Sequence, residues 1–419
     1  MGAYAADKLY YPASPKRIFM DSHSCDYVII GAGATGTALA RALARRAPKA
    51  VIRVLEKEDD VAKHTSGKNS GVVHAGFNQK PGTLKARLCV EGNRLLKDFC
   101  RTRRVPLLED GILTMARLDS DIPVLQELLR RGTENGVEGL RLLEPSAIAA
   151  LEPHALGCAG LHAPSGANVD SAAYVRALAQ EAREAGVVFH FNHKIDTMEE
   201  SSDGVSVRAG SLTIRARKAI NCAGLHADRI AHLLGAGLDY TIVPFRGEYY
   251  YLKPEKAGIL RSMVYDAPSL RYPFLGIHWT RLAGGRVKVG PNAIIALGRE
   301  AYDWSQSSPS DGLEMVGNPR FWKMLVNWEF LRLLSSNLKT SLSKDAFLRQ
   351  ASGLIRGVAP EDFGAGSSGI RAQLVDRRGR LCDDLILEDK GACLHVLNVV
   401  SPGLTCSLPF ADYLADRLR

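Results

Sequence analysis

A glycine-rich turn between a short apolar strand and an Ala/Leu-rich helix constrains this chain more than any other feature. Gly31, Gly33 and Gly36 are spaced as GxGxxG. They stand between an expected strand, residues 27–30, and an expected helix, residues 35–46. Glycines at this spacing let backbone N–H groups approach a pyrophosphate at the helix N-terminus, where the helix dipole favours negative charge. The turn therefore predicts a Rossmann-type half that binds a dinucleotide.

Glu56 narrows the choice of dinucleotide. It follows the second expected strand, residues 51–55, and stands about 20 residues beyond the last glycine. A carboxylate accepts hydrogen bonds from ribose hydroxyls and repels a 2′-phosphate, so NADP is disfavoured, whereas FAD and NAD remain open. Lys57, the next residue, is included among the expected cofactor contacts.

Length and charge limit the class of protein. A chain of 419 residues exceeds a single hydrophobic core, so we expect about two domains. No apolar run approaches the ~20 residues that a membrane helix needs. The net charge of +9 is spread along the chain, which favours affinity for a membrane surface or an acidic substrate over nucleic acid.

The cysteines and the N-terminus indicate the compartment. Eight cysteines lack the paired spacing of a metal site, and several lie inside apolar runs, so we expect buried, reduced thiols and no metal. Residues 1–24 lack the continuous apolar stretch of a secretory signal and are interpreted as an irregular leader. These features favour a cytoplasmic location. Peripheral contact with the inner membrane is a further expectation, with a mitochondrial location if the chain is eukaryotic, although residues 1–24 do not resemble a typical transit peptide.

Two kinds of pattern alternate along the rest of the chain. Helix-to-strand periodicity recurs at residues 171–191, whereas residues 240–292 carry the aromatic strands typical of an antiparallel sheet. The expected fold class is α/β, with a Rossmann-type cofactor domain and a second domain on a mainly antiparallel sheet. We place residues 25–105, 145–235 and 360–419 in the discontinuous cofactor domain, and residues 106–144 and 236–359 in the substrate domain.

The segment HTSGKNSGVVHAGF, which begins at His64, favours FAD over NAD. Its small and hydroxylated residues let the backbone pass close to a planar ring. Here the chain resembles the FAD-dependent oxidoreductases of the D-amino-acid oxidase class. The segments GLRLLEPSAIAALEP, IVPFRGEYYYLKPEK, RYPFLGIHWT, GPNAIIALGREAY and GIRAQLVDRRG are similar to the L-2-hydroxyglutarate dehydrogenase family, from about residue 25 to the C-terminus. The contacts expected from this loop are Thr65, Ser66, Asn69, Ser70 and Gly71.

The resemblance implies an FAD enzyme that oxidises L-2-hydroxyglutarate to 2-oxoglutarate by hydride transfer to flavin N5 and passes electrons to a quinone or another acceptor. NCAGLHADRI resembles the second FAD motif of the class, in which Ala223 and Gly224 approach the cofactor, and Val187 or Ile195 is expected beside the adenine. SPGLT precedes the last expected helix, so its backbone amides would stabilise charge on the reduced flavin. The contacts expected from this turn are Gly403, Leu404 and Thr405.

The implied substrate is a dianion, which arginine suits because its guanidinium binds carboxylates in a bidentate manner. Arg371, in SSGIRAQ, matches the position of a substrate-binding arginine in related flavoenzymes. Arg246, in PFRGEY, is the second candidate, and strand alternation would put Tyr250 on its face and Tyr249 on the other.

Oxidation of an alcohol also needs a base, for which histidine has the most suitable pKa. We favour His278, in FLGIHWT, slightly over His74, in VVHAG, and expect His64 to contact the loop or the flavin. Two alternatives remain at this point. One is a flavin oxidoreductase for another small anion, such as glycerol 3-phosphate, L-malate or a secondary amino acid, and the other is a flavin-binding protein without turnover. The oligomeric state is left open.

Overall fold

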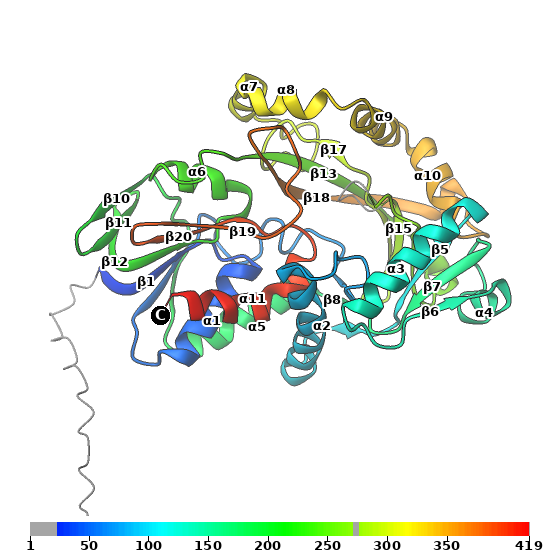
Figure 1. Ribbon diagram of the computed structural model, residues 1–419, viewed down its shortest axis with the longest axis horizontal. Coiled ribbons are helices and arrows are strands. Elements are labelled where there is room, and N and C mark those ends of the chain that lie inside the picture. The colour runs from blue at the N-terminus through cyan, green and yellow to red at the C-terminus, as the bar shows by residue number, and fades with distance from the viewer. Residues whose placement is uncertain (1–22, 271–275, 419) are drawn as a thin grey trace, which may run out of the picture.

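The computed structural model describes residues 23–270 and 276–418 (Figure 1). The leader expected over residues 1–24 lies outside the described residues except for its last two positions. Residues 271–275, the first half of the RYPFLGIHWT segment, also lie outside them. Within the described part, no helix combines the length and the apolar content that crossing a bilayer requires.

The first sheet has eight strands and contains the glycine-rich turn. Strands β1 (Ser24–Ile30) and β2 (Ile52–Leu55) are parallel neighbours, as expected for a Rossmann-type half. Strand β12 (Leu212–Asn221) pairs in parallel with the other side of β1, so three strands end at one edge of the sheet. The other strands of this sheet are β9 (Val188–His190), β10 (Thr197–Ser201), β11 (Gly204–Ala209), β19 (Ile386–Lys390) and β20 (Cys393–Asn398).

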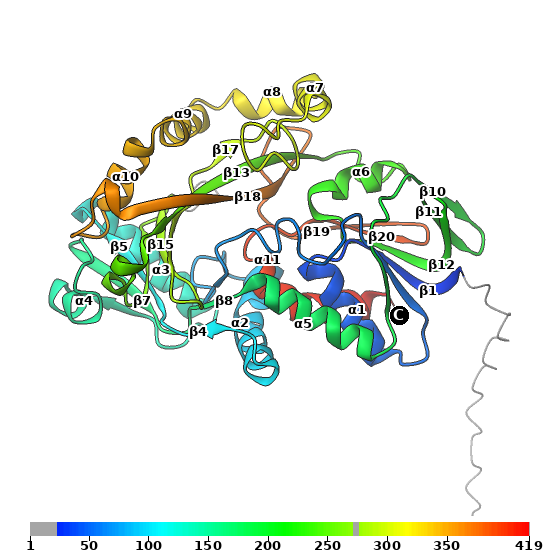
Figure 2. The same cartoon turned by 180° about the vertical axis from the view of Figure 1, so that it is seen from behind.

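A group of helices covers one face of this sheet (Figures 1 and 2). They are α1 (Ala34–Arg46), α2 (Leu84–Arg103), α5 (Ser171–Glu184) and α11 (Gly403–Arg417). Between α5 and α11, the hydroxyl groups of Tyr174 and Ser407 form a hydrogen bond of 2.8 Å, which satisfies two polar groups inside an otherwise apolar core.

The second sheet has nine strands and is mainly antiparallel, as expected. Its longest pair is β13 (Thr241–Leu252) with β18 (Phe363–Val375), antiparallel over almost their whole length. The other strands are β5 (Ile112–Ala116), β6 (Arg141–Leu143), β7 (Ala159–Ala163), β14 (Met263–Asp266), β15 (His278–Arg281), β16 (Val287–Gly290) and β17 (Ile294–Ile295). A small third sheet contains β3 (Val72–Val73), β4 (Leu107–Leu108) and β8 (Ala167–Val169).

Four helices follow one another in an arc along the outer side of the second sheet (Figure 1). They are α7 (Pro309–Gly317), α8 (Pro319–Leu325), α9 (Trp328–Leu342) and α10 (Lys344–Ser352). The remaining helices are α3 (Ile122–Glu134), α4 (Pro145–Leu151) and α6 (Ala227–His232), with short 3-10 turns η1 (Asp119–Asp121), η2 (Gly224–His226), η3 (Pro254–Ile259) and η4 (Pro360–Asp362).

The expected division of the chain differs from the observed strand pairing at two places. Strands β7 and β18 belong to the second sheet, although they lie in the ranges 145–235 and 360–419 that we assigned to the cofactor domain. Helix α4 also forms within residues 140–164, a stretch with three prolines whose pattern predicts extended chain. A local sequence pattern predicts a strand but does not encode which partner the strand pairs with, so the exact domain boundaries stay a prediction.

Candidate active site

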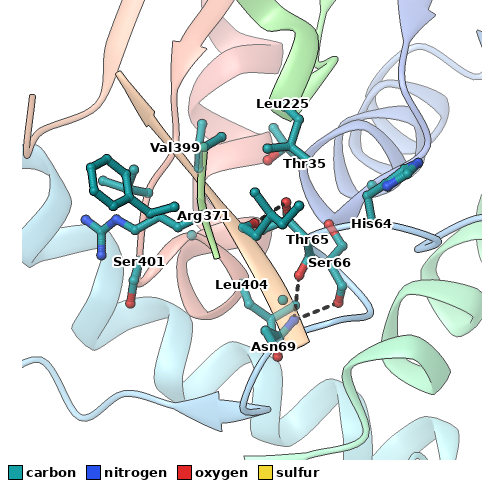
Figure 3. Close-up of a pocket in the computed structure, with 18 of the residues that line it drawn as sticks. Thr35, His64, Thr65, Ser66, Asn69, Leu225, Arg371, Val399, Ser401 and Leu404 are labelled. Atoms are coloured by element: carbon teal, nitrogen blue, oxygen red, sulfur yellow. Dashed lines mark hydrogen bonds between the residues drawn. The ribbon is translucent and has the colours of Figure 1, made fainter. Parts of the chain in front are cut away.

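A large cavity of about 1010 Å³ is lined by residues of both main sheets. Its volume is at the upper end of the range for small-molecule sites, roughly 300–1,000 Å³, and gives room for a dinucleotide with a small substrate beside it. Figure 3 shows Thr65, Ser66 and Asn69 on one wall, and Arg371, Val399 and Ser401 on another. Most of the residues that we predicted for the site meet in this cavity.

The three glycines of the turn have different structural roles. Gly31 has φ +101°, and a Cβ there would lie 2.6 Å from the carbonyl oxygen of Cys222. A Cβ on Gly36 would lie only 2.0 Å from the carbonyl oxygen of Gly31, so this glycine lets α1 pack against the end of β1. Gly33 lines the cavity and leaves the N-terminus of α1 without a side-chain cap. The N–H of Ala34 is donated to the Ser66 hydroxyl at 2.9 Å, and the positively polarised helix end lines the cavity, which suits a pyrophosphate.

Glu56 is held at the carboxyl end of β2. Its Oε2 accepts the N–H of Ala32 at 2.7 Å, and its Oε1 accepts the N–H of Glu58 at 3.0 Å. The cavity wall here includes Glu56, Lys57 and Ile195, whereas Val187 is buried in the core of the first sheet and does not reach the cavity. Of the two residues expected beside the adenine, only Ile195 therefore lines the cavity. His193 also lines this end, and no local sequence signal pointed to it.

The loop that begins at His64 joins the two sheets. The Thr65 hydroxyl donates to the carbonyl oxygen of Ile370, on strand β18, at 2.9 Å. The Asn69 amide donates to the carbonyl oxygens of Thr65 and Ser66, both at 2.9 Å, so the loop is folded back on itself (Figure 3). Gly71 does not line the cavity: its φ of +70° and its closeness to Val169 shape the loop instead. Ala223 and Gly224 also line the cavity.

An ion-pair network lies at the start of this loop. The Lys57 ammonium is 2.6 Å from Glu300 and also contacts Glu58. His64 lies 2.8 Å from Glu58, and His226 lies 2.8 Å from Glu300. These contacts keep the pKa of Glu300 well below its usual range. Although Glu58, His64 and Glu300 are close enough to share a metal ion, the ammonium already supplies the positive charge between the carboxylates.

The N-terminus of α11 meets the same cavity. Gly403, Leu404 and Thr405 form its first turn and line the wall, and Pro402 provides no side-chain cap. The Thr405 hydroxyl accepts the backbone N–H of His74 at 3.0 Å. The positive end of this helix dipole therefore faces the cavity, close to the position of His74.

The two candidate bases, His278 and His74, line the same cavity but have different partners. His278 is 3% exposed, and its Nδ1 lies 3.0 Å from the carbonyl oxygen of Gly276, so Nδ1 carries the proton. Its Nε2 has no hydrogen-bond partner within the described part of the chain. In His74, by contrast, Nε2 forms a hydrogen bond of 3.3 Å with the Ser401 hydroxyl. Burial lowers the pKa of each imidazole to about 4, so both are neutral at physiological pH.

Arg371 and Arg246 lie on opposite faces of the paired strands β13 and β18. Arg371 lines the cavity, and its Nε donates to the amide oxygen of Gln373 at 3.0 Å. Burial lowers the pKa of Arg371 to about 10, which leaves it charged at neutral pH. Its neighbour across the pair, Phe245, faces the cavity with it.

The structure corrects our placement of Arg246 and Tyr250. Arg246 forms an ion pair with Glu248 at 3.0 Å and stacks on Trp304, and Tyr250 packs against Phe347 of α10. Neither lines the cavity, whereas Tyr249 does. Alternation correctly separated the two tyrosines, but it does not indicate which face of a strand meets the ligand.

Lys288 is a charged residue near the site that our sequence reasoning missed. Its ammonium donates to the carbonyl oxygen of Asn69 at 2.9 Å and lies 3.9 Å from the centre of the Tyr249 ring, which separates it from the cavity. Burial lowers its pKa to about 8. A signal was available, because Lys288 stands between two valines of a buried strand, where a lysine is costly unless it has a specific partner.

Comparisons with known proteins show the family of the chain. The family model described as FAD dependent oxidoreductase matches residues 26–417. The L-2-hydroxyglutarate dehydrogenase of Indibacter alkaliphilus is 36% identical, over 93% of this chain and 97% of its own. The mitochondrial L-2-hydroxyglutarate dehydrogenase of Homo sapiens is also 36% identical, over 94% of this chain and 89% of its own.

Solved structures support the fold. The L-alpha-glycerophosphate oxidase of Mycoplasma pneumoniae, with FAD bound, superposes with a TM-score of 0.76 at 22% identity, over 94% of both chains. The glycine oxidase of Geobacillus kaustophilus superposes with a TM-score of 0.71 at 17% identity, over 95% of both chains. The expected fold class and the expected cofactor, FAD, are confirmed. The chain belongs to the FAD-dependent oxidoreductases and, within them, to the L-2-hydroxyglutarate dehydrogenase family.

Proposed function

We propose that this protein oxidises L-2-hydroxyglutarate to 2-oxoglutarate. The observation that carries the proposal is the meeting, in one cavity beside the glycine-rich turn, of a half-buried arginine with a neutral histidine whose Nε2 has no partner in the described chain. FAD, when bound there, supplies the acceptor for a hydride. The residues of this chain supply the remaining requirements, which are binding of a dianion and removal of a proton.

Arg371 is the proposed anchor of the substrate. Its guanidinium lines the cavity, and charge-assisted, bidentate hydrogen bonds to a carboxylate are the strongest contacts that such a side chain makes. Lys85 lines the same cavity, and Lys288 lies behind Tyr249. Because Lys85 is ion-paired with Asp383 at 2.9 Å, Arg371 and Lys288 supply the excess positive charge of this region, which matches an anionic substrate.

His278 is the proposed base. Its Nδ1–H is donated to Gly276, which fixes the ring and leaves the Nε2 lone pair to accept the hydroxyl proton. As the O–H and α-C–H bonds break, the C=O bond of the product forms, and the proton and the hydride leave in different directions. Stacking on Tyr265, with ring centres 4.2 Å apart, restricts the imidazole further.

The proposal is tested by turnover with a soluble dye as electron acceptor. Purified protein is offered L-2-hydroxyglutarate, D-2-hydroxyglutarate, L-malate and glycerol 3-phosphate, and the product is identified by mass spectrometry. We expect one 2-oxoglutarate for each dye reduced by two electrons, from the L-isomer alone. Faster turnover of glycerol 3-phosphate or L-malate would instead support a flavin oxidoreductase for another small anion.

The FAD site is tested by the substitution Gly36→Ala. The new methyl group would lie 2.0 Å from a backbone oxygen that cannot move away, so α1 has to shift from β1. We expect a loss of about 1–3 kcal/mol in the free energy of unfolding and of most of the bound FAD. Gly312→Ala in α7, where a Cβ meets nothing within 4 Å, is the matched control. It should keep the stability and the FAD content of the parent protein. Unchanged flavin content in the Gly36 variant would contradict the assigned role.

The dependence of kcat/KM on pH should follow two groups of the site. Because the pKa of His278 is lowered to about 4, its imidazole stays neutral and able to accept a proton at every pH above that value. The pKa of Lys288 is lowered to about 8, so its positive charge is lost as the pH rises through 8. We expect kcat/KM to be level between these values and to fall on both sides. In the variant Lys288→Met the fall near pH 8 should disappear, which leaves only the loss of the Arg371 charge near pH 10, and a fall that persists near pH 8 would assign that limb to another group.

Two further features are proposed, the electron acceptor and the contact of the protein with a membrane. A quinone is the proposed electron acceptor, and the protein is proposed to contact a membrane peripherally, because its net charge of +9 favours an anionic surface. The human relative is named as mitochondrial.

A further inference from the structure

Large apolar side chains are exposed along the arc of helices α7 to α9. Three of the four tryptophans of the chain lie in or beside this arc, and Trp304, Trp322 and Trp328 are 47%, 54% and 65% exposed. The fourth, Trp279, is fully buried. Val326 and Leu313 are exposed by 81% and 75%. Such a concentration of exposed apolar residues is uncommon on a soluble protein and marks an interaction surface.

The exposed residues are carried by well-formed helix ends. The Asn318 side chain caps α8 by accepting the N–H of Arg320, and the Asn327 side chain caps α9 by accepting the N–H of Glu329 and of Phe330. On these two helices and the turn between them, Trp322, Val326 and Trp328 are exposed, while Phe321, Met324 and Phe330 are buried against β13. The three exposed residues, here called the apolar rim, are thus fixed on the surface.

The apolar rim borders the cavity of the active site. Lys323, Met324, Asn327 and Phe330 line that cavity and alternate along the chain with the rim residues. Lys323 and Asn327 are also exposed to solvent, so the cavity reaches the surface at this point. Phe245, which packs on Phe330 and is the cross-strand neighbour of Arg371, connects this outer part with the proposed substrate site.

Basic residues outnumber acidic ones beside the rim, where Glu329 of α9 is the exposed carboxylate next to Trp328. Lys323 and Arg332 lie on α8 and α9, and the turn that contains Arg378 packs against α8, where its Gly379 meets the backbone of Met324. In the part of the chain that the structure describes, none of these three cations forms an ion pair with a carboxylate. Each basic residue near an anionic lipid surface strengthens binding by roughly fivefold.

We propose that the apolar rim docks on an anionic lipid surface and that a membrane quinone reaches the active site through the opening beside it. The second part rests on the proposed function. Tryptophan prefers the boundary between lipid and water, and exposed apolar residues ringed by Lys and Arg are the pattern of surfaces that lie on membranes. This combination favours lipid over a second protein, since protein interfaces are depleted in lysine.

The electron balance of the cycle closes with these two reactants. The hydroxy acid loses two electrons and two protons when it becomes 2-oxoglutarate, and a quinone takes up two electrons and two protons when it becomes a quinol. Because the quinone head enters at the rim, its apolar tail can stay in the lipid. A lipophilic acceptor then reaches the cavity without crossing water.

The docking is tested with vesicles and without reference to activity. Holoprotein is sedimented with phosphatidylglycerol-containing vesicles or with pure phosphatidylcholine vesicles, and tryptophan quenching by brominated lipid is recorded. We expect binding to the anionic vesicles, quenching, and weaker binding at high salt. The triple variant Trp322→Ser, Val326→Ser, Trp328→Ser should lose at least tenfold in binding. Leu118→Ser, which removes a 65% exposed leucine before α3, is the matched control and should bind as the parent does.

The quinone route is tested with two acceptors. The triple variant should keep dye reduction and FAD content but lose at least tenfold in reduction of a long-chain quinone embedded in vesicles. Parent protein that fails to bind anionic vesicles, or a triple variant that binds them unchanged, would overturn the docking. A dimer that light scattering detects for the parent but not for the triple variant would also overturn the docking on lipid, because a second copy of the chain would then cover the rim. If the parent fails to oxidise L-2-hydroxyglutarate with the dye, the proposed function fails, while the vesicle result still decides the docking.

Discussion

Replacing His278 with asparagine is expected to lower kcat by about 10²- to 10⁴-fold. The asparagine amide can still donate to the carbonyl oxygen of Gly276, as Nδ1 of the imidazole does, but it offers no atom at the position of Nε2. The substitution therefore removes the base and keeps the contact that orders the loop. Rapid mixing under anaerobic conditions measures the rate constant for bleaching of the flavin, and the FAD content of each preparation reports whether the site is intact.

His74→Asn is the matched comparison. His74 lines the same cavity, but its Nε2 shares a hydrogen bond with Ser401 and its backbone N–H is already donated to Thr405. We expect a smaller loss, below about tenfold, because the proton-accepting atom of His278 remains. A larger loss in the His74 variant than in the His278 variant would exchange the roles of the two histidines.

Replacing Arg371 with methionine is expected to lower kcat/KM for L-2-hydroxyglutarate by about 30- to 4,000-fold, since removal of one member of a buried, hydrogen-bonded charge pair costs about 2–5 kcal/mol. The side chain lines the cavity, and its loss leaves a substrate carboxylate without a partner. Arg371→Lys keeps a charge but loses the planar fork, so its effect should be intermediate. Steady-state kinetics with dye, expressed per bound flavin, provide the measurement.

Arg246→Met is the control for this prediction. Arg246 stands on the neighbouring strand but on the opposite face, where Glu248 and Trp304 hold it. Its removal should lower the melting temperature and leave kcat/KM per bound flavin within about threefold. If both arginine variants lost activity equally at full flavin content, the assignment of the substrate anchor to Arg371 would be contradicted.

The cofactor half of the fold was predictable because its signal is local. A GxGxxG turn requires a strand before it and a helix after it, and Glu56 stands where the second strand ends. The structure has this arrangement in β1, α1 and β2. Helix α4, by contrast, is only seven residues long and begins at a proline inside a stretch with two further prolines, so its periodicity was too short to detect.

At the site, prediction from the sequence failed for two reasons. Strand alternation separated Arg246 from its neighbours correctly, but the choice of the face that meets the cavity depends on how the two sheets pack, which no local pattern contains. Lys288 was missed because its importance comes from Asn69 and Tyr249, which are far away in the sequence. Gly36 and Gly71 were expected as cofactor contacts, whereas the structure gives them the role of shaping the backbone.

The most direct test of the central claim is anaerobic reduction of the bound flavin. The long-wavelength absorbance of the oxidised flavin is recorded before and after addition of L-2-hydroxyglutarate, D-2-hydroxyglutarate or L-malate, with no other acceptor present. We expect complete bleaching by L-2-hydroxyglutarate, with one 2-oxoglutarate formed for each flavin, and no bleaching by the D-isomer. A preparation with full FAD content that L-2-hydroxyglutarate leaves oxidised would contradict the proposed function.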